Sequence, residues 1–259
     1  MTSSGTSSNG FDRLLAGKRI LITGGSSGIG QGICLVAARE GGKVAFTWSE
    51  NKAGAEATEK QIREYGADCK AIQADLREKD SANKIVAEVE AAWGEIDALV
   101  NNAGFSEAVP FVLLDDDDFA DVLELNLFAT FRMCRAAVRG MVRQKYGRIV
   151  NISSIVGSRA LPGPVHYAAS KGGIEGLTRS LAHEVGLYGV LVNAIAAGIF
   201  EGGLRATIPE HHQKRYVDAC ALRRFGKPEE CGELAVWLLS DRNTYINGTV
   251  IFLDGGTLG

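Results

Sequence analysis

The segment Tyr167–Lys171 carries a tyrosine and a lysine in the pattern Tyr-x-x-x-Lys. This spacing places both side chains on the same face of a helix, one turn apart. A free phenol has a pKa of about 10 and donates protons poorly at neutral pH, whereas a nearby ammonium group lowers that pKa. The pair is therefore a candidate for proton transfer. The same spacing also occurs on solvated helix faces, so its meaning depends on the rest of the chain.

A glycine-rich turn near the N-terminus is typical of nucleotide binding. A short apolar segment, Arg19 to Thr23, leads directly into this turn, and helical apolar spacing follows it. Glycines between a strand and a helix let the backbone approach a pyrophosphate, and the helix N-terminus supplies free N–H groups. The order is Gly-x-x-x-Gly-x-Gly, not the usual Gly-x-Gly-x-x-Gly. We expect a dinucleotide to contact Gly24, Ser26, Ser27, Gly28, Ile29 and Gly30.

The next expected strand, residues 43–47, indicates which dinucleotide binds. It ends at Trp48 and a polar turn with Ser49, Asn51 and Lys52. In dinucleotide-binding folds a carboxylate at this point binds the ribose 2′-hydroxyl. Its absence here removes a repulsion against a 2′-phosphate, which the polar turn can hydrogen-bond. We expect NADP(H) in contact with Trp48 and Ser49. NAD(H) stays an alternative, since these can also be ordinary turn residues and the turn has no arginine.

Small and polar residues follow the third and fourth expected strands, residues 69–73 and 96–100. Ligands of open α/β sheets bind at the carboxyl ends of the strands. Asp75 can reach the adenine amino group there, or it can cap the helix that extends to Trp93. We expect cofactor contacts from Asp75, Leu76, Asn102, Ala103 and Gly104.

The next expected helix contains two polar features, each with a structural and a functional interpretation. The acidic residues 115–118 look like a metal site, but acids in a first helical turn offset the helix dipole, and we predict no metal there. Asn126 lies among apolar neighbours. It either makes an ordinary core hydrogen bond or holds a water near a proton relay.

Composition excludes several classes of function. The chain has 259 residues with a net charge of −3, which allows one full core and argues against a nucleic-acid surface. Its five cysteines form no Cys-x-x-Cys pair, which fits a cytoplasmic protein without a disulfide framework or zinc site. No apolar segment reaches membrane-spanning length. The Ser/Thr/Gly-rich residues 1–12 predict a disordered tail, and residues 13–259 a dinucleotide-binding catalytic domain.

Strand-like and helix-like segments alternate along the whole domain. Later strands are expected at residues 148–152, 191–195 and 249–253, and Pro228 at the start of a helix. Residues 200–221 have weaker patterning and are predicted to be a mobile insertion that covers the substrate. The alternation predicts an α/β fold, a doubly wound (Rossmann-type) parallel sheet of about seven strands in a single domain.

Taken together, these segments resemble the short-chain dehydrogenase/reductase family from about Leu15 to Leu258. No single motif is decisive, but their common order is hard to obtain by chance. The matching segments are TGGSSGIG (residues 23–30), NNAG (residues 101–104), Asn126, Ser154, Tyr167 with Lys171, and LDGG (residues 253–256).

The resemblance implies a catalytic tetrad of Asn126, Ser154, Tyr167 and Lys171. Tyr167 would be the acid/base, and Ser154 would hydrogen-bond the substrate carbonyl. Lys171 would bind the nicotinamide ribose and lower the Tyr167 pKa. Asn126 would hold a water that passes protons to Lys171. The resemblance also implies cofactor contacts near the nicotinamide from Tyr167, Lys171, Gly198 and Ile199.

Within the family the chain is most similar to the β-ketoacyl-acyl carrier protein reductases and related ketoreductases. This implies a homotetramer that reduces a 3-oxoacyl thioester or related ketone with NADP(H), the substrate being free or bound to a carrier protein. Ala197 and Glu201 stand where the family has proline and threonine, and the carboxylate of Glu201 favours a substrate other than a plain acyl thioester. The alternatives are an NAD-linked sugar, polyol or cyclic-alcohol dehydrogenase and a non-catalytic nucleotide-sensing protein.

Overall fold

Parallel strands form the centre of the fold. The computed structural model describes residues 13–159 and 163–257, so the predicted tail lies outside the described residues. Its seven-stranded sheet has the order β3-β2-β1-β4-β5-β6-β7, and every neighbouring pair is parallel. The strands are β1 (Arg19–Ile22), β2 (Lys43–Trp48), β3 (Cys69–Gln73), β4 (Ala98–Asn101), β5 (Gly147–Ser154), β6 (Val190–Ala197) and β7 (Val250–Leu253). The predicted doubly wound α/β fold is confirmed.

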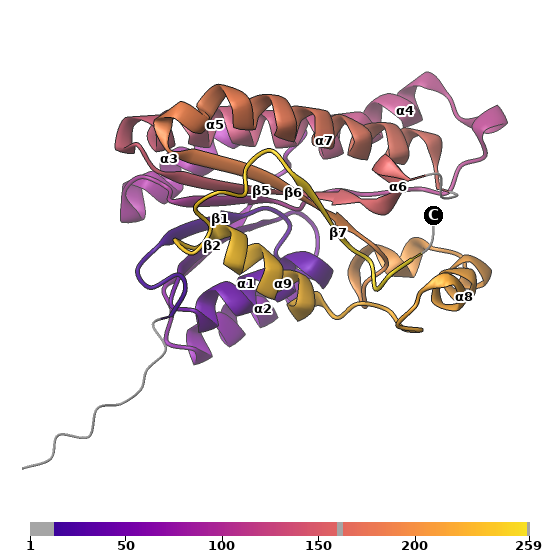
Figure 1. The fold of residues 1–259 in the computed structure, drawn as a ribbon, viewed down its shortest axis with the longest axis horizontal. Coiled ribbons are helices and arrows are strands. Elements are labelled where there is room, and N and C mark those ends of the chain that lie inside the picture. The colour runs from indigo at the N-terminus through magenta and orange to yellow at the C-terminus, as the bar shows by residue number, and fades with distance from the viewer. Residues whose placement is uncertain (1–12, 160–162, 258–259) are drawn as a thin grey trace, which may run out of the picture.

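Helices cover both faces of the sheet, because each parallel strand needs a crossover to reach its neighbour (Figure 1). One face carries α1 (Gly28–Arg39), α2 (Lys52–Glu64) and α9 (Pro228–Leu239). The other face carries α3 (Ser81–Trp93), α4 (Asp116–Leu123), α5 (Ala129–Gln144) and α7 (Val165–Val185). The shorter elements are η1 (Phe111–Leu113), the π-helical turn η2 (Glu124–Phe128), α6 (Ile155–Ser158), η3 (Gly186–Tyr188), η4 (Gly203–Thr207) and α8 (Glu210–Ala219).

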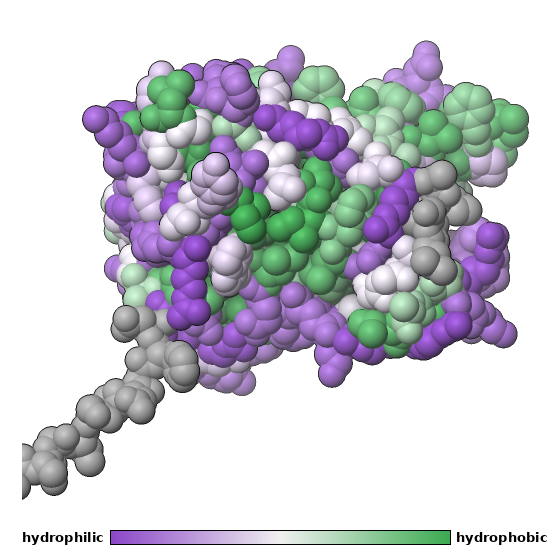
Figure 2. Space-filling model, in the orientation of Figure 1, coloured by the Kyte–Doolittle hydropathy of each residue, from purple (hydrophilic) through white to green (hydrophobic). Residues whose placement is uncertain are grey.

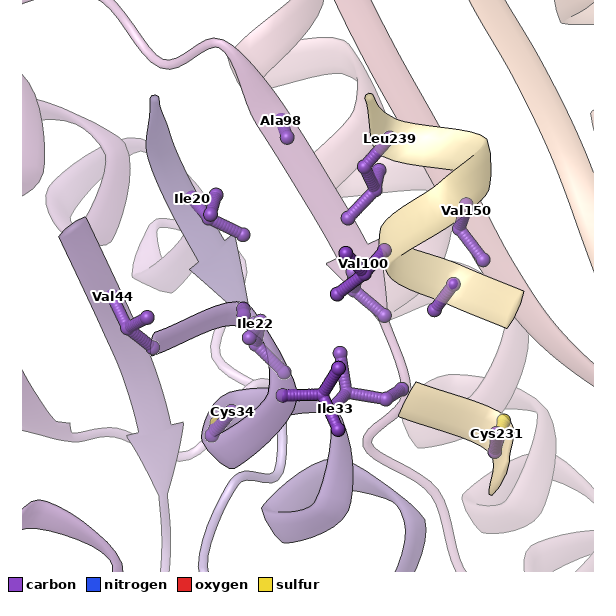
Figure 3. Close-up of a cluster of buried hydrophobic side chains, with 14 of the residues drawn as sticks. Ile20, Ile22, Ile33, Cys34, Val44, Ala98, Val100, Val150, Cys231 and Leu239 are labelled. Carbon is purple, nitrogen blue, oxygen red and sulfur yellow. The ribbon is translucent and has the colours of Figure 1, made fainter. Parts of the chain in front are cut away.

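The core consists of two apolar layers, one on each face of the sheet. Successive residues of β1 point to opposite faces. Ile20 and Ile22 therefore pack with Ile33 of α1 and Leu239 of α9 (Figure 3). Leu21 belongs to the layer on the other face. Since both faces are covered, nearly every residue of β4, β5 and β6 is buried, whereas a sheet with one solvated face would alternate between buried and exposed residues.

Strand register brings distant segments to one edge of the sheet. Asn101 of β4 lies beside Asn151 of β5, and Ser154 at the end of β5 lies beside Ala197 of β6. β1 lies between β2 and β4, which is the point where the strand order reverses. Open α/β sheets bind their ligands outside the carboxyl ends of the strands at this point.

Helix α3 begins later than Asp75, because the chain first makes a turn. The Asp75 carboxylate accepts a hydrogen bond from the Arg77 N–H at 2.9 Å. The helix starts at Ser81, with Asp80 at its N-cap position. The alternative that Asp75 caps this helix is therefore wrong.

The weakly patterned segment at residues 200–221 contains η4 and α8. None of the residues of α8 is buried, so the helix has no apolar stripe that the sequence could reveal. The mobility of this segment remains a prediction. Across residues 13–159 and 163–257, every helix is too short or too polar to cross a bilayer.

Candidate active site

The four predicted catalytic residues come from three elements that meet at the carboxyl edge of the sheet. Ser154 ends β5 and is the N-cap of α6. Tyr167 and Lys171 lie one turn apart on α7. Asn126 lies in the π-helical turn between α4 and α5, a kind of turn that is frequent at functional sites.

Tyr167 and Lys171 both have strongly shifted pKa values. Burial raises the pKa of Tyr167 to about 12, and a hydrogen bond with the Ser154 hydroxyl opposes this shift. Burial lowers the pKa of Lys171 to about 8. The Lys171 ammonium lies 5.5 Å from the Tyr167 ring centroid and donates to the Ile152 carbonyl at 2.8 Å. Burial dominates the Tyr167 pKa in this arrangement, and the lowering by Lys171 that the resemblance implies stays a prediction.

Asn126 is fully buried and makes direct hydrogen bonds to the protein. Its carbonyl oxygen accepts from the Phe105 N–H at 2.9 Å, and its amide donates to the Phe105 carbonyl and the Ser170 hydroxyl, each at 3.0 Å. A Cβ built on Gly104 would lie 2.8 Å from the Asn126 oxygen and 3.7 Å from the Lys171 nitrogen. Asn126 thus lies close behind Lys171, and its predicted role in a water relay stays a prediction.

The glycine turn forms a cradle that side chains would fill. Gly24 and Gly28 have φ values of +72° and +53°, in the left-handed region that favours glycine. A Cβ at Gly30 would collide with the Gly24 carbonyl and with the Asn102 side chain. The turn opens α1, with Ser27 at the N-cap position. These features fit a pyrophosphate, which binds backbone N–H groups at a helix N-terminus.

The end of β4 is tied to this cradle through Thr23, which the sequence interpretation did not single out. The Thr23 hydroxyl accepts hydrogen bonds from the N–H groups of Asn102 and Ala103 at 2.9 and 3.0 Å. The Asn102 amide donates to the carbonyls of Thr23 and Gly24. The side chain of Asn102 therefore supports the glycine turn. The sequence feature that could have indicated the role of Thr23 is its position directly before Gly24, the first glycine of the turn.

The predicted adenosine end lies where β2 and β3 finish side by side. Trp48 pairs with Gln73, whose side chain donates to the Ser49 carbonyl at 3.0 Å. Asn51 caps α2 through Gly54 and also donates to the carbonyl of Ser26 in the glycine turn. The turn after β2, the start of α2 and the cradle are thus joined. Asp75 and Leu76 follow β3 at the same edge, Asp75 largely exposed and Leu76 buried.

The predicted nicotinamide end lies beyond β6. The Gly198 N–H donates to the Leu253 carbonyl at 3.0 Å. The Ile199 carbonyl and the Glu201 N–H both pair with Gly226, while the Glu201 side chain is exposed. A Cβ built on Gly28 would lie 3.0 Å from the Cα of Gly203, so this loop also reaches the glycine turn.

The acidic run before α4 acts as a helix start. The Asp115 carboxylate accepts from the Asp118 N–H at 2.8 Å, and residues 116–118 form the acidic first turn. Within the part of the chain that the structure describes, no group of three His, Cys, Asp or Glu side chains could hold a metal ion.

Comparison with known proteins agrees with this geometry. Residues 24–257 match the family model described as Enoyl-(Acyl carrier protein) reductase. The 3-oxoacyl-[acyl-carrier-protein] reductase of Aquifex aeolicus (strain VF5) is 37% identical over 242 residues, which are 93% of this chain and 98% of that protein. The enzyme of the same name from Staphylococcus aureus (strain Mu50 / ATCC 700699) is 35% identical over 92% of this chain and 97% of its own.

Solved structures share the fold over almost the whole chain. A dehydrogenase/reductase from Sinorhizobium meliloti 1021 is 31% identical with a TM-score of 0.89, covering 96% of this chain and 98% of that one. Levodione reductase is 30% identical with a TM-score of 0.87, covering 93% and 97%. The chain therefore belongs to the short-chain dehydrogenase/reductase family of NAD(P)-dependent oxidoreductases that act on CH–OH groups, as its motifs predict.

Proposed function

We propose that this protein is an NADP(H)-dependent ketoreductase in which Tyr167 is the acid that protonates the substrate oxygen. The observation that carries the proposal is that Ser154, Tyr167 and buried Lys171 meet at the carboxyl edge of the sheet, with Ser154 close enough to Tyr167 to affect its pKa and the Lys171 ammonium 5.5 Å from the Tyr167 ring centroid. Two neighbouring hydroxyl donors suit one carbonyl oxygen, which gains negative charge during reduction. The relatives named as 3-oxoacyl reductases support this reaction class.

Each residue of the site has a distinct task in this proposal. When bound, the nicotinamide cofactor supplies the hydride. Ser154 donates a hydrogen bond that orients the carbonyl, and Tyr167 gives its proton to the oxygen. Lys171 has a pKa of about 8, so it is mostly charged at neutral pH and suited to bind ribose hydroxyls. Asn126 lies behind Lys171 and fixes the segment around it through Phe105 and Ser170.

Tyr167 keeps its proton at neutral pH, because burial raises its pKa to about 12. The protonated phenol is the form that gives a proton during reduction, and the phenolate is the form that takes one during oxidation. The same residue therefore serves both directions, and an assay in each direction separates the reductase from the NAD-linked dehydrogenase.

The substrate is a ketone of a 3-oxoacyl thioester or a related compound, free or bound to a carrier protein. Glu201 gives a specific reason to include other ketones. Its exposed carboxylate lies two residues after Ile199, a predicted contact of the nicotinamide, where the resemblance would place a threonine. A panel of 3-oxoacyl thioesters, cyclic ketones and oxidised sugars, assayed with NADPH and with NADH, tests the proposal. Turnover of at least one ketone with NADPH supports it, and tight NADPH binding without any turnover would favour the nucleotide-sensing alternative.

Assembly and location form part of the same proposal. Phe128, the last residue of η2, and Phe131, in the first turn of α5, are exposed, with 47% and 41% of their surface accessible. Two exposed phenylalanines three residues apart favour contact with another copy, which supports the homotetramer. All five cysteines are free thiols, which supports a reducing compartment such as the cytoplasm.

A further inference from the structure

The turn that begins at Ser154 is held at both ends by buried carboxylates. Helix α6 follows Ser154 and ends at Ser158. On one side, the hydroxyls of Ser153 and Ser158 bind Glu175 of α7. On the other side, Arg159 binds Asp254 at the end of β7. Sequence reasoning did not single out any of these contacts.

Glu175 is 3% exposed and accepts hydrogen bonds mainly from the Ser154 segment. Its Oε1 atom accepts from the Ser153 hydroxyl at 3.0 Å and from the Ser158 hydroxyl. Its Oε2 atom lies 3.4 Å from Arg179, whose side chain is largely exposed. Glu175 follows Lys171 by one turn of α7, as Lys171 follows Tyr167, so the three side chains lie along one face of the helix.

Asp254 binds Arg159 through its side chain and Tyr216 of α8 through its backbone carbonyl. Its Oδ2 atom lies 2.5 Å from an Arg159 nitrogen that also donates to the Thr257 carbonyl at 2.6 Å. The Arg159 guanidinium lies 4.1 Å from the centre of the Phe252 ring. The backbone carbonyl of Asp254 accepts from the Tyr216 hydroxyl of α8 at 3.1 Å. One residue therefore joins the Ser154 turn to the segment that is predicted to cover the substrate.

The turn between these contacts packs tightly on the catalytic helix. A Cβ built on Gly157 would lie 2.9 Å from the backbone of Lys171 and Gly172. A shift of the turn would therefore disturb α7, or would move Ser154 away from Tyr167. The two carboxylates prevent that shift, because each one binds the turn through a buried or half-buried hydrogen bond.

We propose that Glu175 and Asp254 are positioning residues that fix the Ser154 hydroxyl relative to Tyr167, and that Asp254 also sets the position of α8 through Tyr216. The proposal rests on the ketoreductase function proposed above. Loss of Glu175 leaves the Ser158 hydroxyl without its acceptor and the Ser153 hydroxyl with only the Lys171 carbonyl, at 3.2 Å. Loss of Arg159 leaves a buried carboxylate without its counter-charge. Either change displaces Ser154, while the glycine turn lies elsewhere and keeps its affinity for NADPH.

The test compares Glu175→Leu, Glu175→Gln and Arg159→Met with Arg179→Met as the matched control. Glu175→Leu and Arg159→Met should lower kcat/KM for the ketone by about tenfold or more, with the NADPH Kd within about twofold of wild type. Glu175→Gln keeps an acceptor oxygen and should stay within about threefold in kcat/KM. Arg179→Met removes only the outer, exposed partner and should stay within about twofold.

A second measurement follows the turn itself. Amide hydrogen exchange at residues 154–159 should be faster in Arg159→Met and Glu175→Leu than in wild type, and unchanged in Arg179→Met. If Glu175→Leu does not fold, Ser158→Ala replaces it in both measurements. Unchanged kcat/KM, unchanged exchange, or an equal loss of NADPH affinity would overturn the proposal. If the wild type reduces no ketone, the proposed function fails, and the exchange measurement alone then decides whether the carboxylates hold the turn.

Discussion

Tyr167 and Lys171 owe their chemistry to where α7 places them. A phenol on a solvated helix would titrate near 10, and a lysine near 10.5. Burial moves the pKa of Tyr167 up to about 12 and that of Lys171 down to about 8. The two shifts have one cause, since a buried site disfavours the charged form of each group. The phenol that results is protonated at neutral pH, but its raised pKa makes it a weaker proton donor than a free phenol.

Removing the Tyr167 hydroxyl should abolish most turnover. We expect Tyr167→Phe to lower kcat by roughly 100- to 10,000-fold, because the substrate oxygen loses its proton donor. The NADPH Kd should change little, since the glycine cradle is untouched. Tyr188→Phe, at a tyrosine that is 42% exposed on η3, is the matched control and should behave like wild type. Steady-state kinetics and fluorescence titration check both points, and near-wild-type turnover of Tyr167→Phe would contradict the mechanism.

The Lys171 pKa should appear in the pH dependence of stability. The folded-state pKa of about 8 lies below the ordinary value of 10.5, so the unfolded chain binds the proton more tightly. The folded state therefore carries a penalty that is fully present below pH 8 and disappears as the pH rises to 10.5. For a buried group this penalty is about 3 kcal/mol.

We therefore expect Lys171→Met to be more stable than wild type at pH 7, and this advantage to shrink between pH 8 and 10.5. Urea unfolding of both proteins across this pH range measures the difference between their free energies of unfolding. The contributions of the other titrating groups are the same in both proteins and therefore cancel in this difference. A difference that does not vary with pH would show that Lys171 is not the group responsible.

Cofactor choice should depend on the charge after β2. Ser49→Asp places a carboxylate where NAD-binding relatives of this fold bind a ribose hydroxyl. We expect kcat/KM with NADPH to fall by about tenfold or more, because the carboxylate repels the 2′-phosphate, while the value with NADH is kept or raised. Ser49→Asn, which adds no charge, is the control. Equal losses with both cofactors would disprove the proposed 2′-phosphate site.

At the scale of elements, the site depends on how α9 supports α1. A Cβ on Gly32 would clash with Pro228, and a Cβ on Gly232 would lie 2.7 Å from Val36, so the two helices pack almost backbone to backbone. This contact holds α1 against the sheet, with its N-terminus at the glycine turn. Pro228 opens α9 as predicted.

The start of α9 is stabilised by Glu230. Its carboxylate pairs with Arg224 and accepts a hydrogen bond from the Lys227 N–H at 2.7 Å, and these contacts together lower the pKa of Glu230 to about 2. We expect Glu230→Ala to lower the free energy of unfolding by about 1 kcal/mol, the usual value of a lost helix cap. The neighbouring Glu229→Ala is the control, and chemical denaturation measures both. A loss no larger than that of the control would exclude a capping role.

At the scale of the whole molecule, apolar surface remains on both sides of the fold. Figure 2 shows apolar side chains gathered over β7, where Phe252 is 39% exposed. β7 is the last strand of the sheet, and an edge strand with apolar side chains favours a partner. Together with Phe128 of η2 and Phe131 of α5, this gives the monomer two apolar surfaces, as a tetramer with two kinds of contact would need.

Charges on α5 should therefore break the assembly. We expect the variant Phe128→Asp with Phe131→Asp to have a smaller mass than wild type in light scattering, because four carboxylates would have to lie in an apolar contact for each pair of copies. Tyr65→Asp, at an exposed aromatic residue of the α2 face, is the control. A wild type that is already monomeric would refute the proposed tetramer directly.

Local patterns in the sequence were enough to predict the fold, and the same patterns supplied the candidate reacting groups. Apolar segments of β1 and β4, the glycine turn between β1 and α1, and the one-turn spacing of Tyr167 and Lys171 all depend on neighbours in the chain. Such features follow from backbone geometry and the period of each element. The comparisons confirm the family that these motifs indicated.

Only the tertiary structure decided how the site is held and charged. Glu175 and Asp254 find their partners in segments that are distant in sequence, and no periodic pattern links them. The direction of the Tyr167 pKa shift also depends on burial, which the helix pattern alone does not give. The spacing of Tyr167 and Lys171 predicts a proton-transfer pair, whereas only the packing shows that the Lys171 ammonium binds the Ile152 carbonyl and that burial raises the Tyr167 pKa. Burial and long-range contacts are properties of the packed molecule, and they determine here what the same two residues can do.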